Sequence, residues 1–209
     1  CHGHLEISGG SLNATITGQT EASNAIYADS ISISGGEITV SLSKGDAVVS
    51  SNGDMIISNA TVSVMSYNGA GILVFWGELN INSGTVSSTS KCPSNPAISY
   101  GVCVFDDDIT IGNDITSVSF SGDAMGLFTP FNLILSDKLI IKSPENGKLN
   151  TAGNCIIGSD GNVAKAVKIV PQSGSTTYPV WVGNAQVTSA NKDDILGDGG
   201  KAKYYPDSK

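Results

Sequence analysis

A short pattern of residues returns along most of this chain at a spacing of about 24 residues, and it restricts the fold more than any other feature. Leu-Glu-Ile-Ser-Gly-Gly at residues 5–10 recurs as Ile-Ser-Ile-Ser-Gly-Gly at residues 31–36, and weaker copies begin at residues 55, 79, 109 and 133. The steps are 26, 24, 24, 30 and 24 residues, so a 24-residue unit carries insertions of two and six. A unit this short cannot bury a hydrophobic face alone and must stack on copies of itself.

Each unit opens with two apolar residues that flank a third residue, which is the period of a β-strand with one buried face. In the first four units the next apolar pair begins five residues later, as Leu12 does after Ile7. An odd step would place that pair on the outer face of a continuous strand, so a corner must lie between the two segments. Residues at the start of this corner include Gly, Asn and Asp, which tolerate positive φ: Gly9, Gly35, Asn59, Ser83, Asn113 and Asp137.

A third short apolar segment completes each unit. The sequence therefore predicts an all-β fold, a single-stranded right-handed parallel β-helix with about six rungs over residues 1–171, which would make a rod of roughly 29 Å. The fifth and sixth units have a different spacing between their apolar pairs, so we expect irregular rungs there. We expect the third segments to turn one column of residues inward: Ala25, Val49, Leu73, Cys103 and Leu127.

The repeat stops near residue 171. Residues 172–177 are typical of a linker, and residues 178–209 of a small β-rich segment that we interpret as the start of a following module. Within it, residues 178–182 and 185–188 are predicted to pair as a hairpin, followed by a short helix at 190–196 and a strand at 201–205. At the other end the chain begins in the middle of a rung, so we expect the coil to continue upstream.

Charge and composition argue against several functions. The net charge is −8, and all 11 basic residues are Lys, so the basic surface that nucleic-acid binding needs is missing and anionic partners are disfavoured. No apolar run reaches the roughly 18 residues of a membrane span. The four cysteines form no C-x-x-C pair, which fits neither a zinc site nor a disulfide scaffold, and we expect Cys103 and Cys155 to be buried free thiols.

The third segments also predict a candidate binding surface. With the inward column given above, their other apolar residues would face outward on neighbouring rungs and form one patch of the kind that usually marks a contact. Two alternatives remain open: residues 178–209 cover this patch, or the strands face the other way and the patch is core. The candidate residues are Ile72, Val74, Val102, Val104 and Phe128, with Trp76 at the adjoining corner.

Two further segments are candidate sites. The six-residue insertion falls within residues 89–96 and is a loop that leaves the coil, as ligand-binding loops on rigid scaffolds often do. A tolerated insertion without function explains it equally well. Asp106, Asp107 and Asp108 stand together at a corner and could bind Ca²⁺ with turn carbonyls. A solvated acidic turn is the alternative, because successive side chains of an extended segment point in opposite directions.

Two parts of the chain resemble known proteins. The Ile-x-Ile-Ser-Gly-Gly-x-Ile-Thr-Val units, and the segment Val-Trp-Val-Gly-Asn-Ala-Gln-Val-Thr-Ser-Ala-Asn at residues 180–191, resemble β-helix modules of large surface proteins of Gram-positive gut bacteria. The repeat is also similar to that of secreted polysaccharide-binding β-helix proteins. The resemblance implies an extracellular or cell-wall location, a structural or adhesive role, and a glycan or another surface protein as partner.

Some parallel β-helices are polysaccharide lyases or hydrolases, so catalysis must be weighed. Many of those lyases use Arg as a base, and this chain has no Arg. Both histidines, His2 and His4, lie in the first four residues, which makes a Ser-His-Asp set implausible. The sequence therefore favours a non-catalytic structural or adhesive module without a cofactor. A polysaccharide-binding module that uses exposed aromatic side chains such as Trp76 is the alternative.

Overall fold

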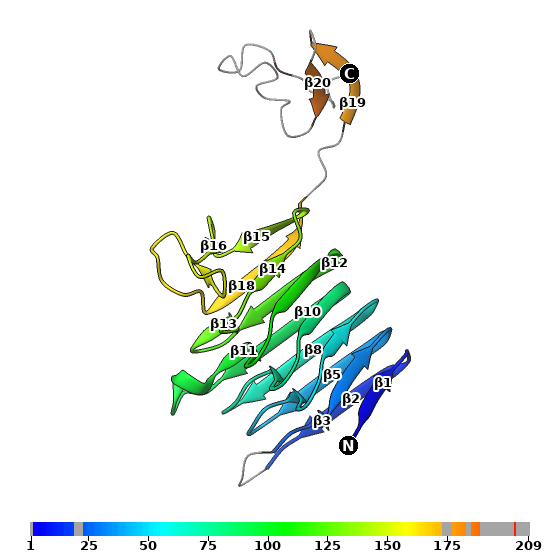
Figure 1. The fold of residues 1–209 in the computed structure, drawn as a ribbon, viewed down its shortest axis with the longest axis vertical. Helices are drawn as coiled ribbons and strands as arrows, with labels where there is room; N and C mark the ends of the chain where they lie inside the picture. The colour runs from blue at the N-terminus through cyan, green and yellow to red at the C-terminus, as the bar shows by residue number, and fades with distance from the viewer. Residues whose placement is uncertain (1, 19–22, 173–176, 183–184, 189–202, 204–209) are drawn as a thin grey trace. The chain divides into compact units, whose positions relative to one another are not determined.

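The structure, a computed structural model, describes residues 2–18, 23–172, 177–182, 185–188 and 203. The chain divides into two compact units, Cys1–Pro171 and Gln172–Lys209, so the division falls at the end of the repeat. The first unit is a parallel β-helix, as predicted, in which short strands stack rung upon rung (Figure 1). It has five complete rungs and the first strand of a sixth.

Three ladders of parallel strands form the sides of the coil, and β10 and β12 each pass through two of them. The first ladder contains β1 (His4–Ile7), β4 (Ser30–Ile33), β7 (Met55–Ile57), β10 (Leu79–Lys91), β12 (Ile109–Ser121) and β14 (Leu133–Leu135). The second contains β2 (Ser11–Ile16), β5 (Gly36–Leu42), β8 (Ala60–Tyr67) and the later parts of β10 and β12. The third contains β3 (Ile26–Ala28), β6 (Val48–Ser50), β9 (Ile72–Val74), β11 (Tyr100–Val104) and β13 (Met125–Phe128).

The register of the first ladder is the repeat register read from the sequence. Leu5 pairs with Ile31, and Ile31 pairs with Met55. The same column continues through Leu79, Ile109 and Leu133. From the second rung on these side chains are buried in one core that runs along the axis of the coil. The 24-residue repeat and its two insertions are therefore confirmed.

The corner after the first strand differs by one residue from the prediction. Positive φ occurs at the second corner residue in three rungs, at Gly10, Gly36 and Gly84, and at the first corner residue, Asn59, in the third rung. The Ser83 hydroxyl accepts a hydrogen bond from the Asn59 backbone N–H at 2.8 Å and donates one to Asn59 Oδ1 at 3.1 Å. Ser83 therefore stabilises the corner through its hydroxyl group rather than through its backbone conformation.

The predicted facing of the third ladder is wrong for β9 and β11, whereas Leu127 of β13 is buried in the central core as predicted. Ile72 and Val102 pair with each other and are buried in the central core, as are Val74 and Val104. The residues between them point out of the coil, so Leu73 and Cys103, which were expected to face inward, lie on its outer side. The physical reason is that apolar residues occupy both faces of these short strands, so alternation carries no information about which face is buried. The four interior residues cannot form the outer patch proposed from the sequence: Ile72, Val74, Val102 and Val104.

The last rungs are irregular, as expected. The ladder between β10 and β12 has two register shifts. In the sixth unit an antiparallel strand, β18 (Ala166–Pro171), pairs with β12 where the next parallel strand would lie, and β15 (Leu139–Ser143) pairs with the other edge of β18. Two short strands lie between β15 and β18 in the sequence, β16 (Lys148–Leu149) and β17 (Ile156–Ile157), and they pair with each other.

The second unit contains a hairpin of β19 (Thr177–Val182) and β20 (Ala185–Thr188), which pair antiparallel as predicted. The helix expected at residues 190–196 and the strand expected at 201–205 lie outside the described residues. Among the described residues, the structure contains no helix long and apolar enough to cross a membrane.

Candidate binding groove

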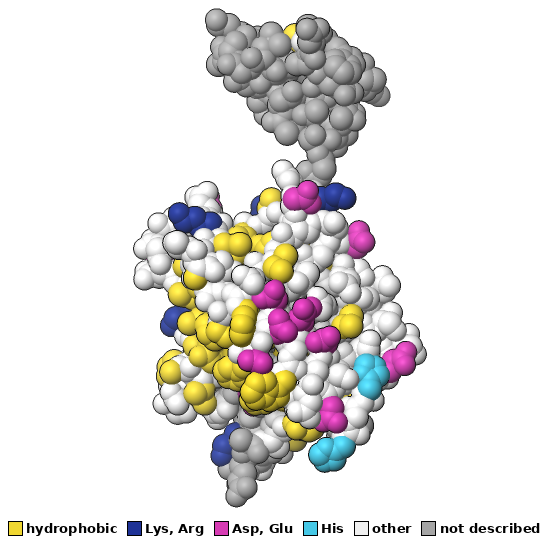
Figure 2. All heavy atoms as spheres, in the orientation of Figure 1, with side chains coloured by type: hydrophobic (Ala, Val, Ile, Leu, Met, Phe, Trp, Pro, Cys, Tyr) yellow, Lys and Arg dark blue, Asp and Glu magenta, His cyan; other side chains and the backbone are white. Residues whose placement is uncertain are grey.

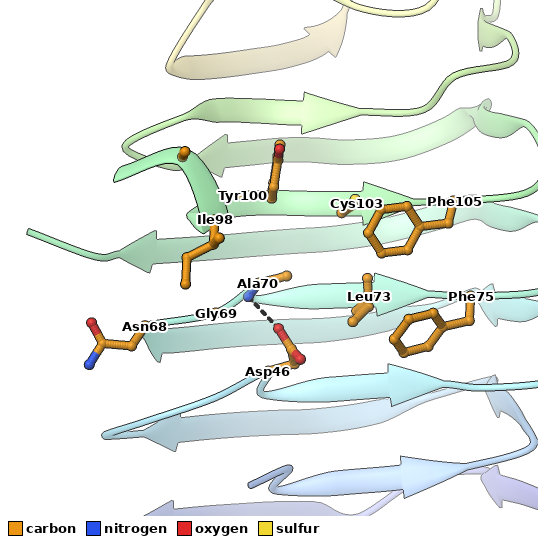
Figure 3. A pocket seen from close by; sticks show the side chains of 11 residues that line it. Asp46, Asn68, Gly69, Ala70, Leu73, Phe75, Ile98, Tyr100, Cys103 and Phe105 are labelled. Carbon is orange, nitrogen blue, oxygen red and sulfur yellow. Dashed lines mark hydrogen bonds between the residues drawn. The ribbon is translucent and has the colours of Figure 1, made fainter. Parts of the chain in front are cut away.

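A groove of about 370 Å³ lies on the outer face of the third ladder (Figure 3). We call it the aromatic groove. Its floor is formed by side chains that point out of β9 and β11, and its walls come from the corner after these strands and from the insertion. The residues that define it are Leu73 and Cys103 on the floor, Phe75 and Phe105 on one wall, and Ile98 and Tyr100 on the other side.

Phe75 and Phe105 form a wall because they take the same position in neighbouring rungs. Each is the first residue after its strand, and each donates its backbone N–H to the rung before, Phe75 to the carbonyl of Ser50 and Phe105 to that of Val74. Their ring centroids are 5.5 Å apart with an angle of 25° between the planes, so the two rings stack. They remain 37 % and 47 % exposed, which leaves an apolar wall open to solvent.

The six-residue insertion supplies the opposite side of the groove. After β10 the chain leaves the coil and forms the short 3-10 helix η1 (Pro96–Ile98), whose Ile98 side chain reaches toward the groove (Figure 3). The loop is tied to the coil at both ends. Cys92 N–H donates to Asp123 Oδ2 at 2.7 Å, and the Ser99 hydroxyl is 2.9 Å from that of Ser90. These two contacts hold the ends of the loop against the coil.

The floor of the groove is apolar and buried. Leu73 and Cys103 are buried although they point out of the coil, and with Val49 and Ala70 they form a small second core. Burial raises the pKa of the Cys103 thiol to about 12, and the nearby Asp46 carboxylate adds to this shift. Cys103 is therefore a neutral thiol at physiological pH and has little nucleophilic character.

Asp46 is the carboxylate that lines the groove. Its Oδ1 accepts a hydrogen bond from the backbone N–H of Ala70 at 2.6 Å, and burial raises its pKa although this hydrogen bond acts in the opposite direction. Ala70 is 24 residues away, one rung along the coil. Asp54 accepts from the N–H of Glu78 across the same distance in sequence. These carboxylates therefore link successive rungs.

The three aspartates of the proposed calcium site do not converge. The Asp108 carboxylate accepts hydrogen bonds from the backbone and side-chain nitrogens of Asn132, one rung on, at 2.8 and 2.9 Å. Asp107 accepts from the backbone N–H of Asp108 at 2.9 Å, and Asp106 is exposed. No group of three or more His, Cys, Asp or Glu side chains in the described part of the chain could hold a metal ion. The calcium hypothesis gains no support, because Asp107 and Asp108 instead accept hydrogen bonds within the corner and from the next rung.

Two of the candidate patch residues remain on the surface. Trp76 is 59 % exposed and follows Phe75 at the corner, next to the groove rather than in it. Phe128 is half-buried and packs against Tyr100, with ring centroids 5.9 Å apart. Cys92, Cys103 and Cys155 are buried free thiols, which confirms the expectation for the last two.

The residues that form the walls were not predicted from the sequence. A signal for Phe75 and Phe105 was present, because both follow the third segment directly in consecutive units. No comparable signal existed for Ile98, which lines the groove only because of the path that the insertion takes after β10. Figure 2 shows the consequence: hydrophobic side chains gather on one face of the coil, and acidic side chains adjoin them.

In comparisons with known proteins, no protein-family model, no characterised protein and no solved structure matches this chain.

Proposed function

We propose that this chain is a non-catalytic adhesive module of a secreted or cell-surface bacterial protein, and that it holds its ligand in the aromatic groove. The observation that carries the proposal is the exposure of Phe75, Phe105 and Ile98 around a buried apolar floor. Exposed apolar side chains gathered in a concave surface mark binding sites more often than other surfaces do. The resemblance of the repeat to bacterial surface modules supports the location.

The chemistry of the groove supports binding rather than catalysis. Glycoside hydrolysis uses two carboxyl groups about 5–9.5 Å apart. Among the described residues that line the groove, Asp46 is the one carboxylate, and its Oδ1 is already hydrogen-bonded to the N–H of Ala70. The Cys103 thiol is neutral and lies beneath the walls, so it does not supply a nucleophile. A rigid coil with an apolar groove provides what a non-catalytic binding module needs.

The proposal is tested with the purified 209-residue chain against a panel of immobilised polysaccharides and proteins. We expect Phe105→Ser to reduce any specific binding at least tenfold, because it removes a central apolar contact. Phe131→Ser is the matched control, since Phe131 is 46 % exposed but does not line the groove. Binding that survives Phe105→Ser unchanged, or that Phe131→Ser weakens equally, would place the ligand elsewhere and refute the proposal.

Trp76 favours a second candidate function, the binding of a neutral polysaccharide. A tryptophan that is 59 % exposed offers a flat apolar surface on which a sugar ring can stack. Glu78, two residues after Trp76, and the net charge of −8 disfavour charged, acidic polysaccharides. In this case Trp76→Ala abolishes binding to a neutral polysaccharide while Phe105→Ser has a smaller effect. The reverse order of effects supports the groove.

A further inference from the structure

We infer that the ligand of the aromatic groove is an extended segment of another protein, with one apolar side chain in the groove and Lys or Arg residues beside it. This inference rests on the proposed function and deepens it, because it names the partner. It combines two observations: the apolar lining of the groove and the distribution of charge at its two ends.

The lining selects a hydrocarbon side chain over a sugar. Leu73, Ile98 and the two phenylalanine rings present carbon atoms to the groove, while its polar side chains, Asp46, Asn68 and Tyr100, lie on the side away from the phenylalanine wall. Sugar hydroxyl groups placed against the carbon atoms would lose water without gaining hydrogen bonds, which costs free energy, whereas a Leu, Ile or Phe side chain loses nothing of this kind. Phe75 and Phe105 also stack on each other at 5.5 Å, so one face of each ring is already occupied. A single anchoring side chain in a dry pocket is the usual centre of a protein interface.

The corner next to the phenylalanine wall is acidic. Phe105 is followed directly by Asp106, Asp107 and Asp108, and the same corner carries Glu78 in the rung before. Figure 2 shows acidic side chains beside the hydrophobic ones on this face. Basic residues of a partner that lie within about 10 Å of this corner would be attracted at moderate salt concentration.

The two ends of the groove differ in their carboxylates. Four carboxylates stand at the corner beside Phe105, whereas at the other end Asp46 is the carboxylate among the described lining residues, and burial raises its pKa. The partner segment is therefore expected to carry its Lys or Arg residues on one side of the anchor, over the acidic corner. This asymmetry distinguishes a specific site from the general attraction of a chain with a net charge of −8 for any cation.

The test is selection of a random peptide library displayed on phage against the full 209-residue chain. Selected peptides are synthesised, and their dissociation constants are measured by fluorescence anisotropy at low and high salt. We expect a consensus of one Leu, Ile, Phe or Met with Lys or Arg within about four positions on one side. Replacing the apolar residue of the peptide by Ser is expected to weaken binding at least tenfold.

Protein variants separate the two contributions. Phe105→Ser is expected to abolish binding of the selected peptides. Asp106→Asn and Glu78→Gln are each expected to weaken it roughly two- to fivefold, the usual range for an exposed ion pair, and to reduce its salt dependence. Asp114→Asn is the matched control, because Asp114 is exposed at a different corner of the coil, and it should leave binding unchanged.

The possible outcomes are distinct. Groove-dependent peptides without basic residues, or an effect of Asp114→Asn equal to that of Asp106→Asn, overturn the inference and leave the proposed function standing. A neutral polysaccharide that binds in a Phe105-dependent manner, with no peptide selected, also overturns the inference in favour of a glycan ligand. If no peptide, protein or polysaccharide binding depends on Phe105, the proposed function fails together with the inference.

Discussion

Gly36 offers the sharpest test of how the rungs stack. It has a φ of +91°, and a Cβ atom placed there would lie 2.6 Å from the carbonyl oxygen of Gly10 and 2.9 Å from the carbonyl carbon of Gly9 in the rung before. Both contacts are with backbone atoms, which cannot rotate away as a side chain can. An alanine at this position must therefore push one rung away from the other or change the corner.

The free-energy cost can be divided between two causes. A residue other than glycine at positive φ costs about 1–3 kcal/mol, and forcing an extra carbon into a packed site costs about 1–3 kcal/mol more. Gly36→Ala should therefore lower the free energy of unfolding by about 2–6 kcal/mol. Gly10→Ala should show the first cost alone, because Gly10 has a φ of +83° but no atom within 4 Å of the added Cβ. Gly9→Ala has neither problem and should stay within about 0.5 kcal/mol of the wild type.

Urea denaturation followed by far-ultraviolet circular dichroism measures these three values. The expected order of stability is wild type and Gly9→Ala first, then Gly10→Ala, then Gly36→Ala. Equal losses for Gly10→Ala and Gly36→Ala would refute the close approach of the two rungs. Equal stabilities for Gly9→Ala and Gly10→Ala would refute the left-handed conformation at the second corner residue.

Three further predictions concern the core and the groove. Ile72→Ala should lower the free energy of unfolding by about 2–5 kcal/mol because Ile72 is buried. The control Ile134→Ala, at a side chain that is 46 % exposed, should lower it by less than about 0.5 kcal/mol. Similar losses for the two variants in urea denaturation would contradict the facing of β9. The pKa of the Cys103 thiol is raised to about 12 in the folded chain, so above about pH 9 the thiol ionises in the unfolded chain while it stays protonated in the folded one. The free energy of unfolding should therefore fall above about pH 9, by up to about 1.4 kcal/mol per pH unit. A Cys103→Ala variant with the same alkaline loss would show this reasoning to be wrong. Asp46→Asn keeps an oxygen that accepts the Ala70 N–H and removes a carboxylate whose pKa is raised by burial. The variant should therefore be at least as stable as the wild type at pH 7. A loss of more than about 1 kcal/mol in the free energy of unfolding, in the same assay, would contradict this prediction.

Much of the coil could be predicted because its information is local. The column of Leu5, Ile31 and Met55 appears in the sequence at nearly constant spacing, and the structure pairs these residues directly. The position of each corner followed from the odd step between apolar pairs, to within one residue. The changed spacing between the apolar residues after Ile111 predicted the irregular fifth rung. Each of these features depends on residues that are neighbours in the chain or one repeat apart.

The face of the third ladder could not be predicted in the same way. In β9 all three residues are apolar and buried, Ile72 and Val74 by the central core and Leu73 by the walls of the groove. A pattern with two apolar faces is compatible with either orientation, and the orientation chosen from the sequence was the wrong one. This single error moved the proposed contact residues from the outside of the coil to its interior.

The amino-acid sequence by itself determined the all-β class, the parallel coil, the 24-residue register and the two insertions, because a repeat records which residues stack on one another. Only the tertiary structure decided which face of the third ladder is buried and that the insertion brings Ile98 to the same groove as Leu73 and Cys103. The reason is that a groove is made by residues from different rungs, whose distances depend on the stacking and on the path of a loop. No local pattern records those distances.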